Sequence, residues 1–176
     1  MTELTDALKD CGALQFGKFT LASGAESDYY IDIKKASTNP RVLRLISQLM
    51  ALKMQSLGLK PDRIAGVVLG SVPLAAALSL ATGIPYVMIR KEKKDHGTGK
   101  LIEGDLESGD RVLVVEDVIT TAGSSIKAIE TLRSAGASVT DVISVIDREG
   151  GGRENLADAG VDFHPLVKAS ELVMEK

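Results

Sequence analysis

The segment from residue 111 to residue 125, RVLVVEDVITTAGSS, constrains the fold of this chain more than any other. An apolar run ends in two adjacent carboxylates, Glu116 and Asp117, and small hydroxylated residues then lead into a predicted helix. Backbone amides at such a helix N-terminus suit a phosphate, and the carboxylates can accept hydrogen bonds from ribose hydroxyls. The segment therefore predicts an α/β chain that holds a sugar phosphate where this strand ends.

Two common phosphate motifs are excluded, since the segment contains neither a Walker A Gly-Lys-Ser/Thr nor a GxGxxG turn. A plainer interpretation is an ordinary strand, turn and capped helix. Two acids at a buried strand end are costly without a ligand or a partner, which favours the sugar-phosphate interpretation.

Apolar runs alternate with helical patterns through the later part of the chain. We expect strands at 64–69, 86–89, 112–115, 139–146 and 163–167, and helices at 73–82, 124–135 and 153–159. This alternation predicts a mainly parallel sheet flanked by helices, with ligands beyond the carboxyl ends of the strands. The motifs at Gly70, Arg90, Glu116 and Asp147 follow predicted strands, so we expect them along one edge.

The stretch 64–89 carries no charge over 26 residues, which is long enough to span a bilayer. Its glycines and prolines stand where an α/β chain needs turns, so we interpret it as strand, loop, helix and strand. A strand buried on both faces is expected to be continuously apolar.

The first third of the chain differs from the rest. We expect a short helix at 2–11, β-like runs at 17–21 and 28–33, and a helix that starts after the N-cap Asn39 and ends before Gly58. The apolar residues of that second helix are expected to face the core: Val42, Leu45, Ile46, Leu49, Leu52 and Leu57.

Composition narrows the function. The 176 residues fit one domain, and a net charge of −3 gives no general basic field for nucleic acid or a membrane surface. A single cysteine, Cys11, and a first segment without an apolar stretch are typical of a cytoplasmic protein. Residues 91–110 are rich in charge and glycine, as in a mobile loop, with a plain surface hairpin as the alternative.

Four segments resemble known motifs. Residues 111–125 resemble the phosphoribosyl-diphosphate (PRPP) motif of type I phosphoribosyltransferases, and RKEKKDHG at 90–97 resembles the mobile catalytic loop of orotate phosphoribosyltransferases. FTLASGAESDYYID at 19–32 and DREGG at 147–151 resemble two further segments of that family. The resemblance implies a single phosphoribosyltransferase domain over 1–176. It would have a small N-terminal hood at about 1–38 and an α/β core at 39–176 that carries the mobile loop 91–110.

The implied reaction moves the phosphoribosyl group of PRPP to orotate in pyrimidine biosynthesis, giving orotidine 5′-monophosphate and diphosphate. Its transition state has oxocarbenium character, so no covalent nucleophile is needed. Mg²⁺ is the implied cofactor, held by substrate and water rather than directly by the protein. A homodimer with a loop shared between subunits is implied, without nucleic acid or a membrane.

The resemblance also assigns residues. Lys94, His96 and Asp117 are the implied catalytic residues, and Thr120 and Arg148 the implied orotate contacts. The implied PRPP contacts are Ser71, Arg90, Lys91, Lys94, His96, Glu116, Asp117, Val118, Ile119, Thr120, Thr121, Ala122, Gly123 and Ser124.

Several of these assignments have plainer alternatives. An arginine fork suits a carboxylate, but Arg148 could instead form a salt bridge with Asp147, Glu149 or Glu154. His96 could be an ordinary solvent-facing loop residue. The other histidine, His164, has no visible partner in the sequence and is interpreted as structural.

The hood has its own implied contacts and a departure from the family. Tyr29 and Tyr30 could line the base pocket. Ala22 stands where many relatives have lysine, which leaves Lys34 or Lys35 as possible substitutes. The turn at Gly70 also lacks the Tyr-Lys pair of many bacterial relatives.

Two other functions stay open. The first is a phosphoribosyltransferase for another base. The second is a non-catalytic regulator that binds PRPP or a nucleotide, for which a DNA-binding segment would be expected and is not seen.

Overall fold

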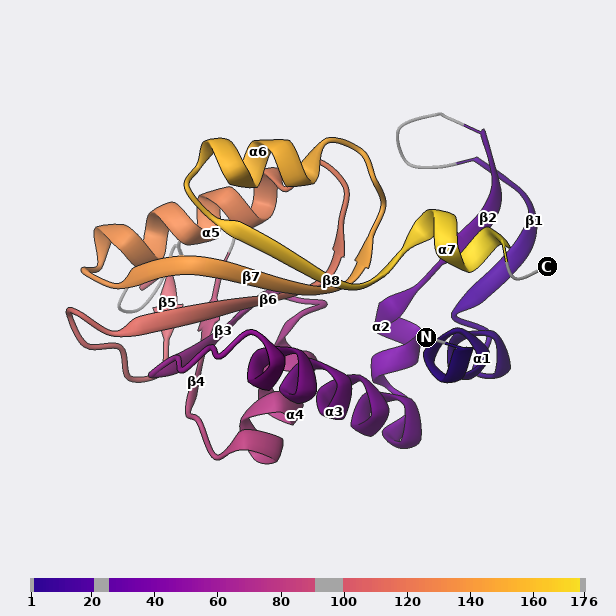
Figure 1. Cartoon of the computed structure of the whole chain (residues 1–176). Helices are drawn as coiled ribbons and strands as arrows, with labels where there is room; N and C mark the ends of the chain where they lie inside the picture. Colours follow the sequence, from indigo (N-terminus) through magenta and orange to yellow (C-terminus); the bar gives the residue numbers. More distant parts are fainter. Residues whose placement is uncertain (1, 21–25, 91–99, 175–176) are drawn as a thin grey trace.

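The computed structural model describes residues 2–20, 26–90 and 100–174. The chain begins with a small unit, which we call the hood. It consists of α1 (Thr2–Asp10), β1 (Leu14–Thr20), β2 (Glu26–Ile31) and α2 (Ile33–Ser37). β1 and β2 pair in antiparallel fashion. In Figure 1 the hood lies beside one end of the large sheet, next to the C-terminal helix α7 (Ala169–Met174).

The large sheet has six strands in the order β5-β4-β3-β6-β7-β8. Their bounds are β3 Arg63–Val67, β4 Tyr86–Ile89, β5 Ile102–Glu103, β6 Arg111–Ile119, β7 Ser138–Asp147 and β8 Asp162–Lys168. All neighbours pair in parallel except β5, which runs antiparallel to β4. The chain builds outward from β3 to β4 on one side and from β6 to β8 on the other. The strand order therefore reverses between β3 and β6, and a crevice beyond two such strands is where ligands bind in open α/β sheets.

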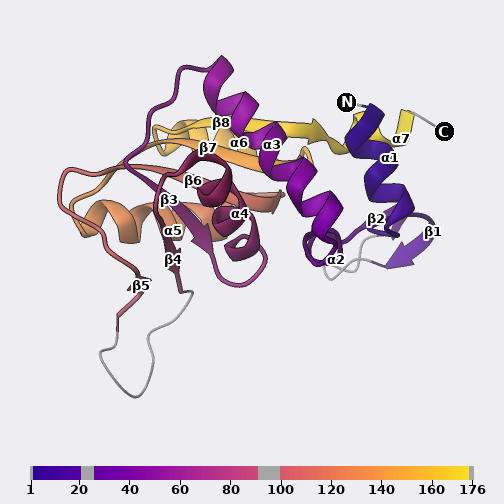
Figure 2. The ribbon, with the colours of Figure 1, turned by 90° about the horizontal axis from the view of Figure 1, so that it is seen from below.

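Helices cover both faces of the sheet. α3 (Pro40–Ser56) and α4 (Val72–Thr82) lie on one face, and α5 (Gly123–Ser134) and α6 (Gly152–Asp158) lie on the other (Figures 1 and 2). Successive residues of a strand point to opposite faces, so Leu113 and Val115 join the first core cluster and Val112 and Val114 the second. This arrangement explains why β6 starts as an unbroken apolar run.

The uncharged stretch forms β3, α4 and β4, as predicted. Within the described part of the chain, no helix is both long and apolar enough to cross a bilayer. The start of α3 is also confirmed, because the Asn39 side chain accepts hydrogen bonds from the amides of Arg41 and Val42.

The predicted core face of α3 was wrong in its second half. Leu52 and Leu57 are 60% and 42% exposed, whereas Met50 and Met54 are buried. Val42, Ile46, Met50 and Met54 recur at a spacing of four and so form one continuous stripe along the helix. Leu52 and Leu57 were predicted to face the core because they are apolar, but they lie outside this stripe.

Three element predictions need correction. β6 does not end before the acidic pair but continues to Ile119, because β7 pairs with it as far as the contact between Ile119 and Asp147. The expected loop 91–110 contains β5, which pairs with Met88 and Ile89. The second β-like run ends at Ile31, and Asp32 caps the short helix α2 by accepting a hydrogen bond from the Lys35 amide.

Candidate active site at the carboxyl ends of the strands

The parallel strands end at the same edge of the sheet, where β6 and β7 extend past the ends of β3 and β4 to Ile119 and Asp147. Gly66 of β3 is in register with Met88 of β4 and Val115 of β6, and Glu116 is in register with Ser144 of β7. The turn at Gly70, Arg90 and the DREGG turn at 147–151 therefore lie along one edge of the sheet, as the sequence predicted. The acidic pair lies at the same edge but within the last part of β6.

Glu116 is buried and links the starts of two helices. Its Oε2 accepts a hydrogen bond from the hydroxyl of Ser71, which precedes α4, and its Oε1 accepts one from Ser125 in the first turn of α5, at 2.8 Å. Only 4% of Glu116 is exposed. The burial of this acid is thus offset by two hydroxyl donors, and it fixes both helix N-termini relative to β6.

Asp117 is the more accessible acid. Its Oδ1 accepts a hydrogen bond from the Val118 amide at 2.8 Å, and its Oδ2 lies 3.7 Å from the Lys34 ammonium of the hood. A Cβ on Gly70 would stand 2.1 Å from the same Oδ2. The turn after β3 can approach Asp117 this closely only because residue 70 is glycine.

The N-terminus of α5 has the geometry of an anion site. Ala122 adopts a left-handed conformation with φ 63°, and its side chain makes no cap hydrogen bond to the helix. The side chain of Asn155 on α6 donates to the Thr121 carbonyl at 3.0 Å, which holds that oxygen toward α6. The first amides of α5 are left without a side-chain cap, and such amides favour a bound phosphate.

The DREGG turn packs directly on this loop. The Arg148 amide donates to the Ile119 carbonyl at 2.8 Å, and a Cβ on Gly150 or Gly152 would stand 2.7 or 2.5 Å from the Thr120 and Ile119 side chains. Two backbones can approach so closely only where side chains are absent. The glycines of this turn therefore bring Arg148 beside Thr120, the pair that the sequence assigned to one ligand.

The Arg148 side chain has no acidic partner within the residues that the structure describes. Its Nε is buried without a hydrogen-bond partner, and its guanidinium lies 5.9 Å from the centre of the Tyr29 ring. Two of the three expected salt-bridge partners are engaged elsewhere, since Asp147 lies 3.8 Å from Arg153 and Glu149 accepts a hydrogen bond from the Ser170 amide. An arginine that is partly buried and has no anion is poised to bind one.

Glu149 anchors this turn to the C-terminal segment. Its amide donates to the Asp147 carboxylate at 2.7 Å, and its own backbone is left-handed with φ 57°. Hydrogen bonds from the side chain and the amide of Ser170 lower the pKa of the Glu149 carboxyl. The turn that carries Arg148 is thus tied to the residues that begin α7.

The hood carries two neighbouring tyrosines on β2, Tyr29 and Tyr30. Tyr29 faces Arg148, whereas Tyr30 is 41% exposed and packs on Phe19 with ring centres 5.6 Å apart. Neighbouring residues of a strand point to opposite sides, so only Tyr29 faces Arg148.

Arg90 is placed at the end of β4, where its Nε contacts Glu103 of β5 at 2.9 Å. The other loop cations assigned from the sequence, Lys91, Lys94 and His96, lie outside the described residues, as does Ala22. His164 does have a partner, which the sequence did not reveal: its Nε2 lies 2.8 Å from Asp141 Oδ1.

Three residues of the site were missed or left undecided by sequence reasoning. Ser125 was missed although it stands in the analysed segment, where its spacing from Glu116 could have been noticed. Asn155 is far away in the sequence and offered no signal. Lys34 was undistinguished from Lys35 until the ion pair with Asp117 was seen.

The donors at the site fit a metal held mainly by a substrate. Among the described residues, no three histidine, cysteine or acidic side chains are grouped so that they could hold a metal ion. Glu116 and Asp117 are the carboxylates of β6 that precede the loop to α5, and the oxygens of Glu116 accept hydrogen bonds from serines. Asp117 alone offers an accessible carboxylate, which suits contact through substrate hydroxyls or water.

Comparisons with known proteins agree with this geometry. The profile of the phosphoribosyl transferase domain family matches residues 32–163. An orotate phosphoribosyltransferase from Pyrococcus horikoshii is 52% identical over 170 residues, which cover 97% of this chain and 91% of the relative. One from Methanosarcina mazei is 52% identical over 171 residues, with 97% and 90% covered.

Solved structures agree as well. The orotate phosphoribosyltransferase from Aeropyrum pernix superposes with a TM-score of 0.87 at 36% identity, covering 98% of this chain and 97% of that one. The Mycobacterium tuberculosis enzyme in complex with PRPP superposes with a TM-score of 0.80 at 30% identity, with 97% of each chain covered.

Proposed function

This chain belongs to the phosphoribosyl transferase family, among its orotate phosphoribosyltransferases, and we propose that it transfers the phosphoribosyl group of PRPP to orotate. The products are orotidine 5′-monophosphate and diphosphate, and the activity is that of a pentosyltransferase (EC 2.4.2.10) in pyrimidine biosynthesis. The observation that carries the proposal is the position of Arg148. Its buried, unpartnered Nε lies next to the Tyr29 ring, on a turn packed against the phosphate loop.

The phosphate loop gives PRPP its orientation in this proposal. The 5′-phosphate binds the amides from Thr120 to Ser124, with Val118 and Ile119 leading into the loop, and the ribose hydroxyls donate to Asp117. Glu116 supports the same subsite by holding Ser71 and Ser125. Orientation of this kind lowers the barrier because the anomeric carbon is held in line with the attacking base.

The base subsite lies across the loop from the helix N-terminus. Arg148 binds the orotate carboxylate with its planar fork, and Thr120 contacts the same ligand from the adjoining loop. Tyr29 closes one side of the guanidinium and restricts its rotation. A base without a carboxylate would leave Arg148 without an anion, which gives the site its preference for orotate.

Departure of the diphosphate requires positive charge. We assign this group to the turn at Gly70 and Ser71, and Arg90 follows the next strand of the chain, β4. We propose Lys91, Lys94 and His96 as further cations of the reaction, with Lys94 and His96 catalytic. Ion pairs and hydrogen bonds from these cations to the diphosphate strengthen as its negative charge develops. The cations therefore stabilise the transition state more than the bound substrate.

We propose Mg²⁺ as the cofactor, bound to substrate oxygens and water. It would supply additional charge neutralisation at the diphosphate. Asp117 would sense the metal only through the ribose hydroxyls or a water molecule, since its accessible oxygen cannot by itself form a coordination shell.

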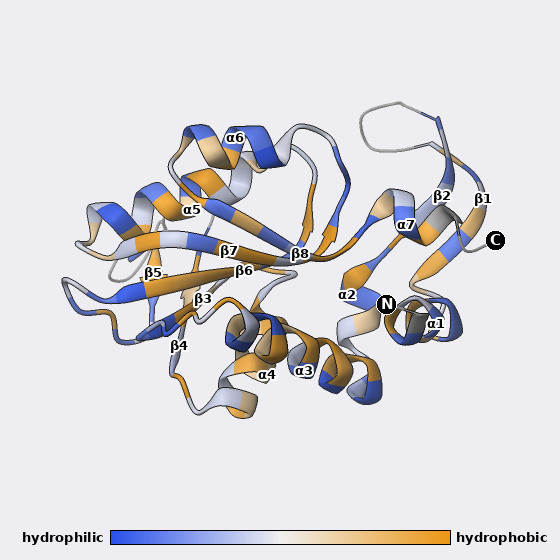
Figure 3. Cartoon of the chain, viewed as in Figure 1, coloured by the Kyte–Doolittle hydropathy of each residue, from blue (hydrophilic) through white to orange (hydrophobic). Residues whose placement is uncertain are grey.

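The proposed assembly is a homodimer, and the face of α4 is the surface that favours it. From residue 64 to residue 89 there is no charged residue, yet Leu69 and Leu80 are 72% and 90% exposed. Figure 3 shows α4 in orange and pale tones, without the strong blue of α1 or α6. An uncharged segment with an exposed leucine on α4 and another just before it suits a contact with another protein. A twofold contact places like residues on like, which an uncharged face permits.

We propose that the catalytic loop, 91–110 in the sequence, is shared between the subunits of this dimer. Mixing Lys94→Ala chains with Asp117→Asn chains tests this sharing. If loops are exchanged, one site of each mixed dimer is intact and part of the activity returns. If demonstrably mixed dimers stay inactive, each loop serves its own chain.

We place the reaction in the cytoplasm, on the ground that a single partly buried cysteine is typical of a reducing compartment.

The function is tested by following orotate absorbance in the presence of PRPP and Mg²⁺, with uracil, hypoxanthine and adenine as rival bases. We expect turnover of orotate and at most trace turnover of the others. Equal or faster use of any rival would overturn the orotate assignment, and binding of PRPP without turnover of any base would favour a regulator.

A further inference from the structure

We propose that Lys34 of the hood is a diphosphate-binding residue of the site. It pairs with Asp117 in this structure, and it turns to the diphosphate of PRPP when that substrate binds. The inference rests on the proposed function, which defines the substrate. It adds a residue from α2 to a site otherwise built from the core.

The hood holds Lys34 in a defined place. α2 begins at Ile33 after the cap Asp32, whose own amide donates to the Ala13 carbonyl at 2.8 Å. The Ser37 hydroxyl donates to the Lys34 carbonyl at 2.8 Å. The backbone of residue 34 is therefore fixed at both ends of a short helix, and only the side chain is free to move.

The ammonium of Lys34 lies near the turn that adjoins the diphosphate. It stands 3.7 Å from Asp117 Oδ2, and a Cβ on Gly70 would stand 2.1 Å from that same oxygen. Lys34 and the turn at Gly70 thus converge on one carboxylate oxygen. A diphosphate at the turn would come within reach of this ammonium after a small rotation of its long side chain.

The pair with Asp117 is weak enough to exchange. A charge-assisted hydrogen bond measures about 2.7–2.9 Å, shorter than the separation seen here. The Lys34 side chain is 64% exposed, so water screens the interaction. A diphosphate carries more charge than one carboxylate and competes well for the ammonium. When the Lys34 ammonium moves away, Asp117 Oδ2 can accept a hydrogen bond from a ribose hydroxyl. One movement of Lys34 thus allows both the contact of Lys34 with the diphosphate and the contact of Asp117 with the ribose.

Lys35 provides a matched control within the same helix. It is also exposed, but its ammonium lies against the turn that follows α1, where a Cβ on Gly12 would stand 2.8 Å from Nζ. The two lysines share charge, length and local backbone, and only Lys34 contacts Asp117.

The experiment compares Lys34→Gln, Lys34→Arg and Lys35→Gln in the full-length protein. We expect Lys34→Gln to raise the KM for PRPP and the inhibition constant of inorganic diphosphate by about tenfold each, the loss of one charged hydrogen bond. The KM for orotate should change less than about twofold, because Arg148 governs that subsite. Lys34→Arg should restore most of the PRPP affinity, and Lys35→Gln should leave every constant unchanged.

Two results would overturn the inference. One is an unchanged inhibition constant for diphosphate in Lys34→Gln. The other is an equal effect of Lys34→Gln and Lys35→Gln, which would mean that the lysines act only by general charge. Thermal melts of each variant identify a loss of folding, and in that case the folded Lys34→Arg variant decides: the inference requires its diphosphate affinity to match that of the unaltered chain.

Failure of the proposed function would be seen separately. If the unaltered chain did not consume orotate, the orotate assignment would fall. Calorimetric binding of inorganic diphosphate to the unaltered chain and to Lys34→Gln would still decide the role of Lys34.

Discussion

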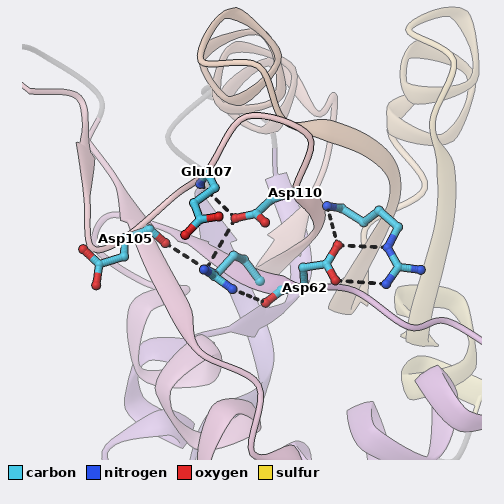
Figure 4. A network of polar contacts seen from close by, with 6 residues as sticks. Asp62, Asp105, Glu107 and Asp110 are labelled. Atoms are coloured by element: carbon cyan, nitrogen blue, oxygen red, sulfur yellow. Dashed lines mark hydrogen bonds and ion pairs between the residues drawn. The ribbon is translucent and has the colours of Figure 1, made fainter.

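The two ends of the parallel sheet use charge in opposite ways. At the amino end, Asp62 accepts hydrogen bonds from the amide, Nε and an Nη of Arg111, each at 2.9 Å. Arg63 donates to the Asp105 carbonyl and lies 3.5 Å from Asp110, whose carboxylate also accepts from the Glu107 amide. Figure 4 shows these contacts as one connected network.

At the carboxyl end Glu116 and Arg90 have partners, but other groups of the described residues are left incompletely paired. Arg148 Nε is buried without a partner, Lys34 and Asp117 are 3.7 Å apart, and α5 begins without a side-chain cap. An arginine and an aspartate are thus fully hydrogen-bonded to each other at the amino end, whereas Arg148 and Asp117 at the carboxyl end are not. The comparison indicates that Asp62 and Arg111 serve the fold, whereas Arg148, Lys34 and Asp117 keep hydrogen-bonding capacity for a ligand.

The largest expected effect tests this division with two arginines. Arg148→Ala should raise the KM for orotate, with a loss of about 2–3 kcal/mol in the binding free energy of orotate, because a bidentate charged pair is lost. Its melting temperature should change little, since among the described residues the side chain has no acidic partner and would lose only its contact with the Tyr29 ring. Arg111→Ala should do the reverse, lowering the melting temperature and leaving both KM values unchanged. Loss of stability without a kinetic effect in Arg148→Ala would make Arg148 structural.

A smaller effect is expected from the two aspartates. Asp117→Asn should raise the KM for PRPP by about 1–2 kcal/mol, because a neutral amide accepts weaker hydrogen bonds than a carboxylate. Asp62→Asn, at the opposite end, should leave PRPP kinetics unchanged. Steady-state assays with PRPP varied at saturating orotate provide the measurement. A similar kinetic loss in both variants would remove the distinction between the two ends.

The smallest expected effect is a change in the stability of the fold at acidic pH. Hydrogen bonds from the Arg111 side chain, and then from its amide, hold the pKa of Asp62 well below its usual range. The folded state therefore favours the charged carboxylate. Its contribution to stability is fully present above the unfolded pKa of about 3.9 and is lost as pH falls through the depressed value.

Urea unfolding of the unaltered chain and of Asp62→Asn can measure this contribution. At pH about 6 the variant should be the less stable of the two, and at pH about 2 the gap should narrow. An equal difference in unfolding free energy at both pH values would show that the stabilising contact between Arg111 and Asp62 does not depend on the charge of Asp62.

The sequence predicted the central elements of the sheet better than the edge strand β5 and the end of β6. β4 has the bounds that were predicted, and α3 begins at its predicted cap, because apolar runs and cap residues are local signals. β5 is held by two residues of β4 rather than by any preference of its own, so no local pattern announced it. β6 runs on through Glu116 and Asp117 because β7 pairs with it there, although neither acid favours a strand.

The same limit applies to the site. The residue types and their order came from the sequence, whereas partnerships depended on segments far apart in the chain. Glu116 was predicted as a ligand contact, but its serine partners emerged only from the packing of two helices on β6. His164 and Asp141 are brought together by the pairing of β7 and β8. The free state of Arg148 depends on where Asp147 and Glu149 find their own partners.

The most direct test of the account is a crystal structure with orotidine 5′-monophosphate, since this one molecule reaches both halves of the proposed site. We predict its phosphate on the amides of residues 120–124, its ribose hydroxyls at Asp117, and its carboxylate in two hydrogen bonds from Arg148. The amino-end network around Asp62 should be unchanged. A nucleotide bound away from the crevice between β3 and β6, or one that leaves Arg148 without an anion, would contradict the account.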